Sequence, residues 1–352
     1  MKLIELHIIQ SFPVTCLNRD DLNAPKTAFF GGVQRARVSS QSWKRAIREI
    51  ASKIQPALFD GKRSHYFAKE IEHALEAENI DSVKAKENAE KIAKFIGDQD
   101  SKYKEGYKTS VALYLTPNEV AGIAKMAAEQ IREKGEVNLK TGTLKKAILD
   151  ITPGDMADIA VFGRMVAKDH TLMVEGAGLF SHALSTHGVS NDIDFFSAVD
   201  DLLPETSEGA GHIGTLEFNS ACYYRYIGLN LDLLADQDHL KHLSEEERDA
   251  VVDTFIRASV LAVPNARKNS MFGHNPPAFV LGLKREGQPL SLANAFEGGI
   301  KSSNGYIKPS VAAIKGHYET LKKVYGIEAA EAVIPDMDLN SFCEAMTKDA
   351  DQ

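Results

Sequence analysis

Residues 215–231, TLEFNSACYYRYIGLNL, carry the strongest strand signal in the chain, and the fold class depends on them. The run is rich in aromatic and aliphatic side chains, its pattern alternates, and no proline interrupts it, which is typical of a β-strand. Two further runs share this apolar character: residues 3–10 (LIELHIIQ) and residues 278–283 (AFVLGL). We therefore predict a sheet whose strands come from the start, the middle and the later part of the chain.

Helices are predicted between these strands. One begins at Ser39-Ser40-Gln41, because a serine at the N-cap accepts hydrogen bonds from the first turn, and Trp43 starts an apolar series at helical spacing. Another begins at Ser244, where Glu247 completes a capping box. The polar segment 11–37, with its prolines and glycines, is predicted to be a loop.

The order of these elements predicts the fold class. Strand, helix, one or more strands, helix and strand in succession match a βαββαβ core, so we predict an α+β protein with a ferredoxin-like core. The same core serves the RNA recognition motif, but many unrelated functions share it, so the fold alone does not assign one.

The region 60–160 differs in composition from both flanks. It is rich in alanine, lysine and glutamate, and residues 84–96 (KAKENAEKIAKFI) are typical of a helix. Thr116-Pro117-Asn118-Glu119 combines a threonine N-cap, a proline at the first helical position and a glutamate that completes a capping box. We predict a helical subdomain inserted into the α+β core.

Composition limits the class of protein. The 352 residues are 43% hydrophobic and 26% charged, which is ordinary for a globular protein, and no apolar run approaches the ~20 residues of a membrane span. The N-terminus lacks a signal-peptide pattern. The three cysteines, Cys16, Cys222 and Cys343, are widely spaced, so neither a disulfide framework nor a CxxC zinc site is expected. We expect a cytoplasmic protein with no membrane partner.

Charge is distributed unevenly along the chain. The formal net charge is −8, which argues against a protein that coats nucleic acid indiscriminately. Between residues 19 and 48, however, seven basic residues face two acidic ones, whereas residues 192–208 carry six acidic residues and no Lys or Arg. We predict one basic face and one acidic projecting segment.

The segment 35–48, RARVSSQSWKRAIR, is the most informative for function. On a helix that begins near Ser40, one face carries Gln41, Lys44, Arg45 and Arg48, opposite Trp43. A helix N-terminus beside a row of cations suits a phosphate backbone. An ordinary amphipathic helix with a solvated basic face explains the same pattern.

Three other features outside this helix could contact nucleic acid or a partner. Phe195-Phe196 lies in the acidic segment and could form a wedge or a docking point, or fold back onto the core. Met165 follows Gly163-Arg164 and could be a second apolar wedge or a core residue. The insertion carries its own lysines, which suit electrostatic contact with a nucleic-acid strand or simply solvation: Lys134, Lys140, Lys145 and Lys146.

Enzymatic motifs are weak. Asp20-Asp21 and Asp192/Asp194 are paired carboxylates that could hold Mg²⁺ in a nuclease, although such pairs more often cap turns. The histidines have no metal-binding spacing, and phosphate-binding, dinucleotide-binding and GxSxG motifs are absent from the sequence. No metal, cofactor or catalytic residue is predicted.

The chain also resembles a known family, through motifs spread over most of its length. The most specific are Cys16-Leu17-Asn18-Arg19-Asp20-Asp21, Phe30-Gly31-Gly32, and Arg35-Ala36-Arg37-Val38-Ser39-Ser40-Gln41-Ser42 followed by Lys44-Arg45. Further matching stretches are residues 163–165, 182–187, 192–201, 212–215, Phe218, 224–226 and 290–297. With these motifs the sequence resembles the CRISPR Cascade backbone subunit, most closely the type I-E CasC family, and the helical insertion is the least similar part.

The resemblance implies a right-hand-like protein without catalytic activity. An RNA-recognition-motif palm would bind guide RNA, a helical insertion would form fingers, and a thumb hairpin would displace one base at regular intervals. Copies of the chain would assemble head to tail along one CRISPR RNA, beside other Cascade subunits, and present the guide for pairing with target DNA. The expected ranges are 1–59 (palm), 60–180 (fingers), 181–189 (palm return), 190–223 (thumb) and 224–352 (palm and C-terminal segment).

The resemblance also implies roles for individual residues. Contacts with the guide backbone are expected from Arg19, Ser39, Gln41, Lys44, Arg45 and Arg48. Met165 would lie against the displaced base, which the thumb residues Phe195, Phe196 and Val199 would cap. Lys134, Lys140, Lys145 and Lys146 match the family's DNA-facing surface only loosely.

Two alternatives stay open at this point. One is a metal-dependent endoribonuclease that uses Asp20/Asp21 or Asp192/Asp194. The other is a free RNA chaperone that forms no regular multimer. In the favoured hypothesis, the acidic residues Asp200 and Asp201 would contact a neighbouring copy, because a head-to-tail contact propagates as a filament.

Overall fold

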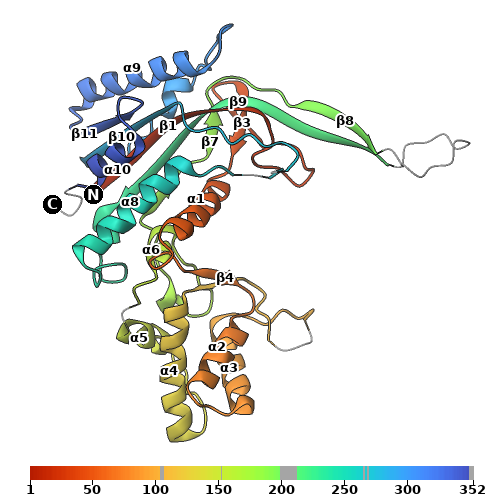
Figure 1. Cartoon of the computed structure of the whole chain (residues 1–352), viewed down its shortest axis with the longest axis vertical. Coiled ribbons are helices and arrows are strands. Elements are labelled where there is room, and N and C mark those ends of the chain that lie inside the picture. Colours follow the sequence, from red (N-terminus) through yellow and green to blue (C-terminus); the bar gives the residue numbers. More distant parts are fainter. Residues whose placement is uncertain (104–106, 152, 199–211, 265, 268, 349–352) are drawn as a thin grey trace, which may run out of the picture.

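The computed structural model describes residues 1–103, 107–151, 153–198, 212–264, 266–267 and 269–348. Its centre is a mixed α+β body built on an antiparallel sheet, from which a long two-stranded ribbon and a helical lobe extend (Figure 1). Val199 and the acidic residues Asp200 and Asp201 lie outside the described residues.

Strand β1 (Lys2–Thr15) occupies the middle of the sheet. It pairs antiparallel with β9 (His212–Asn230) on one side and with β10 (Phe279–Glu286) on the other. β11 (Ala330–Ile334) extends the sheet beyond β10, and β6 (Gly178–Phe180) and β7 (Ala183–Ser185) pair with β9. The three apolar runs of the sequence thus form adjacent strands, as predicted.

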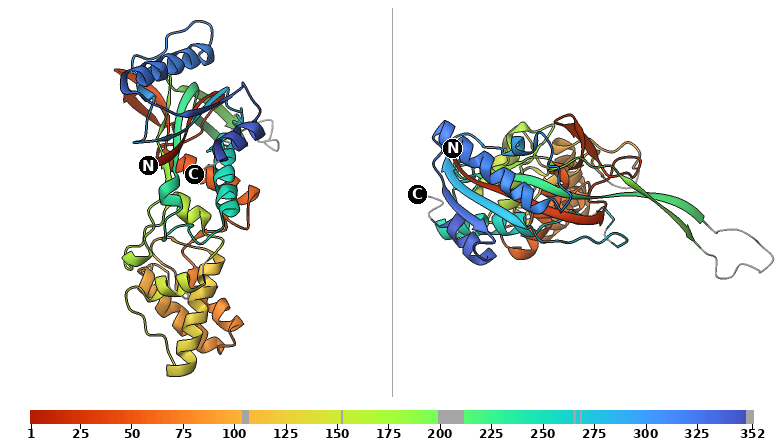
Figure 2. Two further views of the ribbon diagram at one scale, coloured as in Figure 1. Left: turned by 90° about the vertical axis from the view of Figure 1, so that its left-hand side faces the viewer. Right: turned by 90° about the horizontal axis from the view of Figure 1, so that it is seen from above.

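Both faces of the sheet are covered. One face packs on α1 (Ser40–Ile54), α8 (Glu245–Leu261) and α10 (Leu339–Thr347), and the short α7 (Leu231–Leu234) follows β9. The other face packs on α9 (Ile307–Tyr325) and η2 (Ala293–Phe296) (Figures 1 and 2). Because each strand alternates its side chains between the two faces, Tyr223 and Tyr224 belong to different core clusters.

The predicted loop at residues 11–37 contains a hairpin instead. β1 continues to Thr15, and β2 (Thr27–Phe30) pairs with β3 (Val33–Val38) around the two-residue turn Gly31-Gly32. Both glycines have positive φ, 60° and 76°, which a two-residue turn between twisted strands requires. The Gly31-Gly32 pair is typical of a two-residue hairpin turn, and the loop prediction did not use this signal.

The helical insertion has a core of its own. A small ribbon, β4 (Lys62–Ser64) with β5 (Leu113–Leu115), lies at its junction with the body, and four helices follow below it (Figure 1). The helices are α2 (Phe67–Ala77), α3 (Ser82–Ile96), α4 (Pro117–Lys134) and α5 (Thr143–Asp150), with the 3-10 turn η1 (His170–Leu172). Both capping boxes expected from the sequence, at Thr116 and at Ser244, are present.

The insertion ends earlier than the predicted range 60–180. α6 (Ala157–Phe162) and β6 fall inside that range, yet α6 packs in the core of the main body and β6 pairs with β9. α6 is buried along its whole length, including Asp158, whose carboxylate accepts a hydrogen bond from the Tyr114 hydroxyl. A helix that is buried on every side belongs to a core rather than to a surface. Residues 157–162 and 178–180 therefore belong with the sheet.

The projecting ribbon consists of β8 (Asp192–Ala198) and the first part of β9. Figure 2 shows it extending well beyond the sheet when the molecule is seen from above. β9 continues without a break from the ribbon into the sheet, so the predicted thumb boundary at residue 223 falls inside one strand. The shared strand fixes the direction of the ribbon relative to the body.

Candidate nucleic-acid interface

The N-terminus of α1 is tied to two loops of the body. Ser39 is the N-cap, and its side-chain oxygen accepts a hydrogen bond from the Ser42 N–H at 3.3 Å. The Ser39 N–H donates to Asn18 Oδ1 at 2.9 Å, and the Ser40 N–H donates to His182 Nδ1 at 3.1 Å. Two of the first helical N–H groups thus have partners, so this helix start offers an anion fewer free donors than expected.

The predicted two-faced character of α1 is confirmed. Trp43 is 2% exposed and Ile47 is fully buried against the sheet, whereas Gln41 and Arg45 are exposed and Lys44 and Arg48 are half-buried. The Arg225 guanidinium of β9 lies 3.6 Å from the Trp43 ring centroid and so supports the helix from below. The polar face of α1 is therefore held in a fixed orientation.

A polar groove of about 440 Å³ runs beside this face. Arg19 and Arg45 enter it from two different elements, and Ser42 lines it as well. Arg45 donates to Glu49 at 2.8 Å, but exposed pairs one helical turn apart contribute only ~0.3–0.5 kcal/mol. A phosphate can replace that carboxylate as the partner of Arg45. The groove thus brings together two cations that are 26 positions apart in the sequence.

Lys44 and Arg48 lie beside aromatic rings of other elements. The Lys44 ammonium is 5.0 Å from the Phe180 ring of β6, and the Arg48 guanidinium is 5.4 Å from the Tyr114 ring of β5. Partial burial, together with the charge of Arg63, lowers the pKa of Lys44. The cations predicted to share one face of α1 thus point in two directions: Arg45 lies along the groove, and Arg48 lies toward the insertion.

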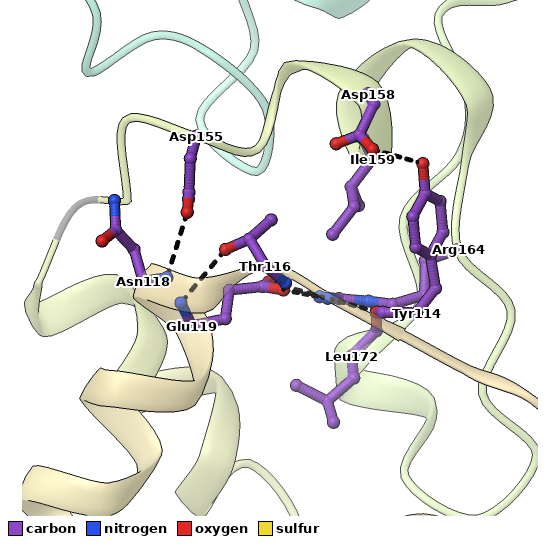
Figure 3. Close-up of polar contacts among 9 residues, drawn as sticks. All are labelled: Tyr114, Thr116, Asn118, Glu119, Asp155, Asp158, Ile159, Arg164 and Leu172. Atoms are coloured by element: carbon purple, nitrogen blue, oxygen red, sulfur yellow. Dashed lines mark hydrogen bonds and ion pairs between the residues drawn. The ribbon is translucent and has the colours of Figure 1, made fainter. Parts of the chain in front are cut away.

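Met165 is presented on an anchored loop. Its side chain is 86% exposed, whereas the preceding Arg164 is buried. Arg164 Nη1 lies 2.7 and 2.8 Å from the two carboxylate oxygens of Glu119, and Arg164 Nε donates to the Leu172 carbonyl at 2.8 Å (Figure 3). Backbone hydrogen bonds to Val174 in both directions complete the anchor. An exposed methionine on a rigid support is suited to pack against a flat apolar group.

Phe195 and Phe196 lie on opposite faces of the ribbon, because successive strand residues point to opposite sides. Phe195 is 75% exposed and pairs with Thr215. Phe196 is 39% exposed and lies across Gly214, where an added Cβ would clash with its ring. The two rings therefore cannot form one continuous wedge. Val199 lies outside the described residues.

The insertion lysines do not form one uniform patch. Lys134, Lys140 and Lys146 are exposed, but Lys145 is half-buried and forms an ion pair with Asp238 at 2.9 Å. Asp238 belongs to the loop between α7 and α8, so this pair connects the insertion to the main body. The sequence around Lys145 gave no indication of this ion pair with Asp238.

The paired aspartates have different settings. Asp20 Oδ1 accepts hydrogen bonds from the N–H groups of Leu22 and Ala24, each at 2.9 Å, and so caps a turn. Asp192 and Asp194 are exposed on β8. Within the described residues, no three His, Cys, Asp or Glu side chains gather as a metal-binding group.

Three further residues at this interface were not singled out from the sequence: Tyr114, Phe180 and the anchor Arg164. Each acts through a partner that is distant in the sequence. The Glu at the third position of the Thr116 capping box was recognised, but nothing local indicates that it also pairs with Arg164.

The family model described as "CT1975-like protein" (Cas_CT1975) matches residues 4–351. The chain belongs to this family. It is also similar to a solved chain of a "CRISPR RNA-guided surveillance complex, pre-nicking", with a TM-score of 0.83 and 29% identity, over 99% of this chain and 100% of that one. A chain of another "CRISPR RNA-guided surveillance complex" matches with a TM-score of 0.73 and 25% identity, over 98% and 99%.

No curated protein sequence matches this CT1975-like chain. Among the helices in the described ranges, each is too short or too polar to cross a bilayer.

Proposed function

We propose that the chain is the guide-RNA-binding backbone subunit of a CRISPR Cascade surveillance complex of type I-E. The full-length similarity to surveillance-complex chains carries this proposal. A second observation supports the proposal: Arg19 and Arg45 line a groove in which they could contact phosphates without reading base edges. Such contacts suit a guide-coating protein, because base pairing must supply the sequence specificity.

In this proposal the sheet body is the palm. The strand order β10-β1-β9 with β6 and β7 outside β9, and the helices α1 and α8 among those on one face, support a ferredoxin-like palm related to the RNA recognition motif. The insertion would be the fingers and the β8–β9 ribbon the thumb. The separate hydrophobic core of the insertion supports its assignment as one unit, the fingers.

The assembly would be a head-to-tail filament of copies along one CRISPR RNA, together with other Cascade subunits in the cytoplasm. An isolated two-stranded ribbon is marginally stable in water, and Ile193 and Phe195 are exposed on it. A ribbon of this kind would gain stability by contacting a bound guide or the next copy. Target DNA would be contacted through the guide.

The role would be non-catalytic. Asp20, one member of the N-terminal pair, already accepts two backbone hydrogen bonds, which supports a structural use of its carboxylate. A cleavage assay with guide and target strands in Mg²⁺ and Mn²⁺ tests this. Intact strands are expected, and cleavage that is lost in the Asp192→Asn or Asp194→Asn variant would overturn the proposal.

The binding role is tested by co-expression with a CRISPR guide. The purified particle should have a high 260/280 nm absorbance ratio and the mass of several copies per RNA. Changing Lys44 and Arg45 to Glu should abolish the RNA content, while Lys323→Glu, a single charge reversal near the end of α9, should not. An RNA-free chain in the presence of all partner subunits would contradict the proposal.

A further inference from the structure

A buried arginine lies beneath the groove that runs beside α1. Arg225 of β9 is 1% exposed, and its guanidinium lies 3.6 Å from the ring centroid of Trp43 on α1. Its Nη1 donates to Gln10 Oε1 of β1 at 2.5 Å, and its Nη2 donates to the Ser259 carbonyl of α8 at 2.6 Å. One side chain therefore joins the sheet to two helices, which lie side by side on the same face of it (Figure 1).

The two helices that Arg225 joins supply two walls of the groove. Ser42 and Arg45 line the groove from α1, and Val263 lines it just beyond the end of α8. The Ser259 carbonyl is among the last of α8, for which the helix itself provides no N–H partner, so the Arg225 guanidinium completes this helix end. Arg225 therefore holds the two walls in position relative to each other from inside the body.

The positive charge of Arg225 is not cancelled by a carboxylate within the described ranges. The guanidinium contacts an amide oxygen, a carbonyl and an aromatic ring, and its Nε has no hydrogen-bond partner there. Burial alone lowers the pKa of Arg225 to about 9, so the group is still a cation at neutral pH.

Such a charge is costly to bury, and the C-terminus of α8 offers it only a partial negative charge. Negative charge brought into the groove would lower this cost, because charges interact more strongly through the protein interior than through water. The free energy of the buried cation thus depends on what occupies the groove.

We propose that Arg225 is a positioning residue for the guide RNA: it holds the two walls of the groove, and its buried charge is balanced when a phosphodiester backbone occupies the groove. Arg225 does not contact the RNA itself, because its side chain is covered by Trp43 and the rest of the core. It acts through the helices that it joins and through its charge. Guide binding and folding are thereby coupled, and bound RNA stabilises the chain by more than its surface contacts contribute.

This inference rests on the proposed function, and the experiment separates the two. Arg225→Met removes the charge and Arg225→Lys retains it, while both lose the planar group that stacks on Trp43. The apparent Kd for guide RNA is measured for the particle assembled with each variant and with the wild-type chain. Circular dichroism verifies folding. If Arg225→Met does not fold, Arg225→Gln takes its place, because glutamine is neutral but can still donate to the Ser259 carbonyl.

Arg35→Met is the matched control. Arg35 is also buried, and its guanidinium donates to the carbonyls of Ser185 and Phe296. Phe296 belongs to the core on the opposite face of the sheet from α1 and α8. The control thus removes a buried arginine that does not support the groove.

Arg225→Met should weaken guide binding about tenfold, the effect of a unit charge acting across one helix diameter, ~10 Å, at an effective dielectric constant of ~20. Arg225→Lys should recover most of this loss, and Arg35→Met should match wild type per folded chain. RNA loading should also raise the melting temperature less for Arg225→Met than for Arg225→Lys. Equal losses of affinity in the two Arg225 variants would overturn the proposal while the proposed function stands.

Tryptophan fluorescence provides a second readout, because Trp43 is the one tryptophan of the chain. Its emission should shift in both Arg225 variants, which lose the stacked guanidinium, and should stay unchanged in Arg35→Met. Unshifted emission in both Arg225 variants would show that the stack does not support α1, and the proposal would be wrong. If the wild-type particle itself binds no RNA, the proposed function fails, and the role of Arg225 fails with it.

Discussion

Replacing Glu119 by glutamine tests how much the buried Glu119–Arg164 ion pair stabilises the loop that carries Met165. The Glu119 side chain is fully buried and accepts from Arg164 Nη1 at 2.7 and 2.8 Å. It also accepts the Thr116 N–H at 3.0 Å in the capping box. Glutamine retains the shape and can still close a capping box, so the change leaves mainly one consequence: an unpaired, buried Arg164 charge.

The size of the effect follows from that burial. Removing one partner of a buried pair costs ~3–5 kcal/mol, which corresponds to an increase in local opening of a hundredfold or more. Hydrogen exchange followed by mass spectrometry should show this increase in α4 and in residues 164–174. The strands of the main sheet should stay protected, because they belong to a separate hydrophobic core.

Glu247→Gln is the matched control. Glu247 completes the other capping box, at Ser244, but it is exposed, so its replacement should cost well under ~1 kcal/mol. If Glu119→Gln and Glu247→Gln accelerate exchange equally, the ion pair is not the anchor. In the double variant with Arg164→Gln, the cost should be less than the sum of the two single costs, because the two side chains interact directly.

Three further predictions concern the interface. Gly214→Ala should push the Phe196 ring off the ribbon, because the new Cβ clashes with it, and hydroxyl-radical footprinting should then show stronger labelling of Phe196; unchanged labelling would count against the packing described. Ser39→Ala removes the side-chain acceptor of the Ser42 N–H and should cost ~1 kcal/mol, measured by denaturation with tryptophan fluorescence, and an unshifted midpoint would show that the cap is dispensable. Burial raises the pKa of Asp158 from 3.8 to about 6, so the folded state keeps this proton to higher pH than the unfolded chain. The stability that the bound proton contributes is present below pH ~4 and is lost as the pH rises through ~6. The unfolding free energy of wild type relative to Asp158→Asn should therefore fall by ~2–3 kcal/mol over that window, and a difference that does not change with pH would refute the prediction.

The strands and helix caps that depend on nearby residues could be predicted from the sequence. The runs at residues 3–10, 215–231 and 278–283 became adjacent strands because they are apolar enough to be buried on two faces. The caps at Thr116 and Ser244 were predictable because a cap depends on residues three positions apart.

The elements that the sequence did not reveal depend on distant partners. The sequence analysis noted Arg164 only as the residue before Met165, and nothing local indicated that it is buried in an ion pair with Glu119, 45 positions away. The stacking of Arg48 on Tyr114 joins α1 to a three-residue strand of the insertion, which is too short to be predicted from periodicity. The opposite orientations of Phe195 and Phe196 follow from strand geometry, and recognising them required placing the pair in a strand first.

The central claim, that the groove beside α1 carries the guide RNA, is tested most directly by photo-crosslinking. A guide containing 4-thiouridine is assembled with the chain and its partner subunits, irradiated, and the crosslinked peptides are identified by mass spectrometry. The account predicts crosslinks in the segments that line the groove, around Arg19 and across Ser42 to Glu49. Crosslinks confined to the insertion lysines between Lys134 and Lys146, with none in either groove segment, would contradict it.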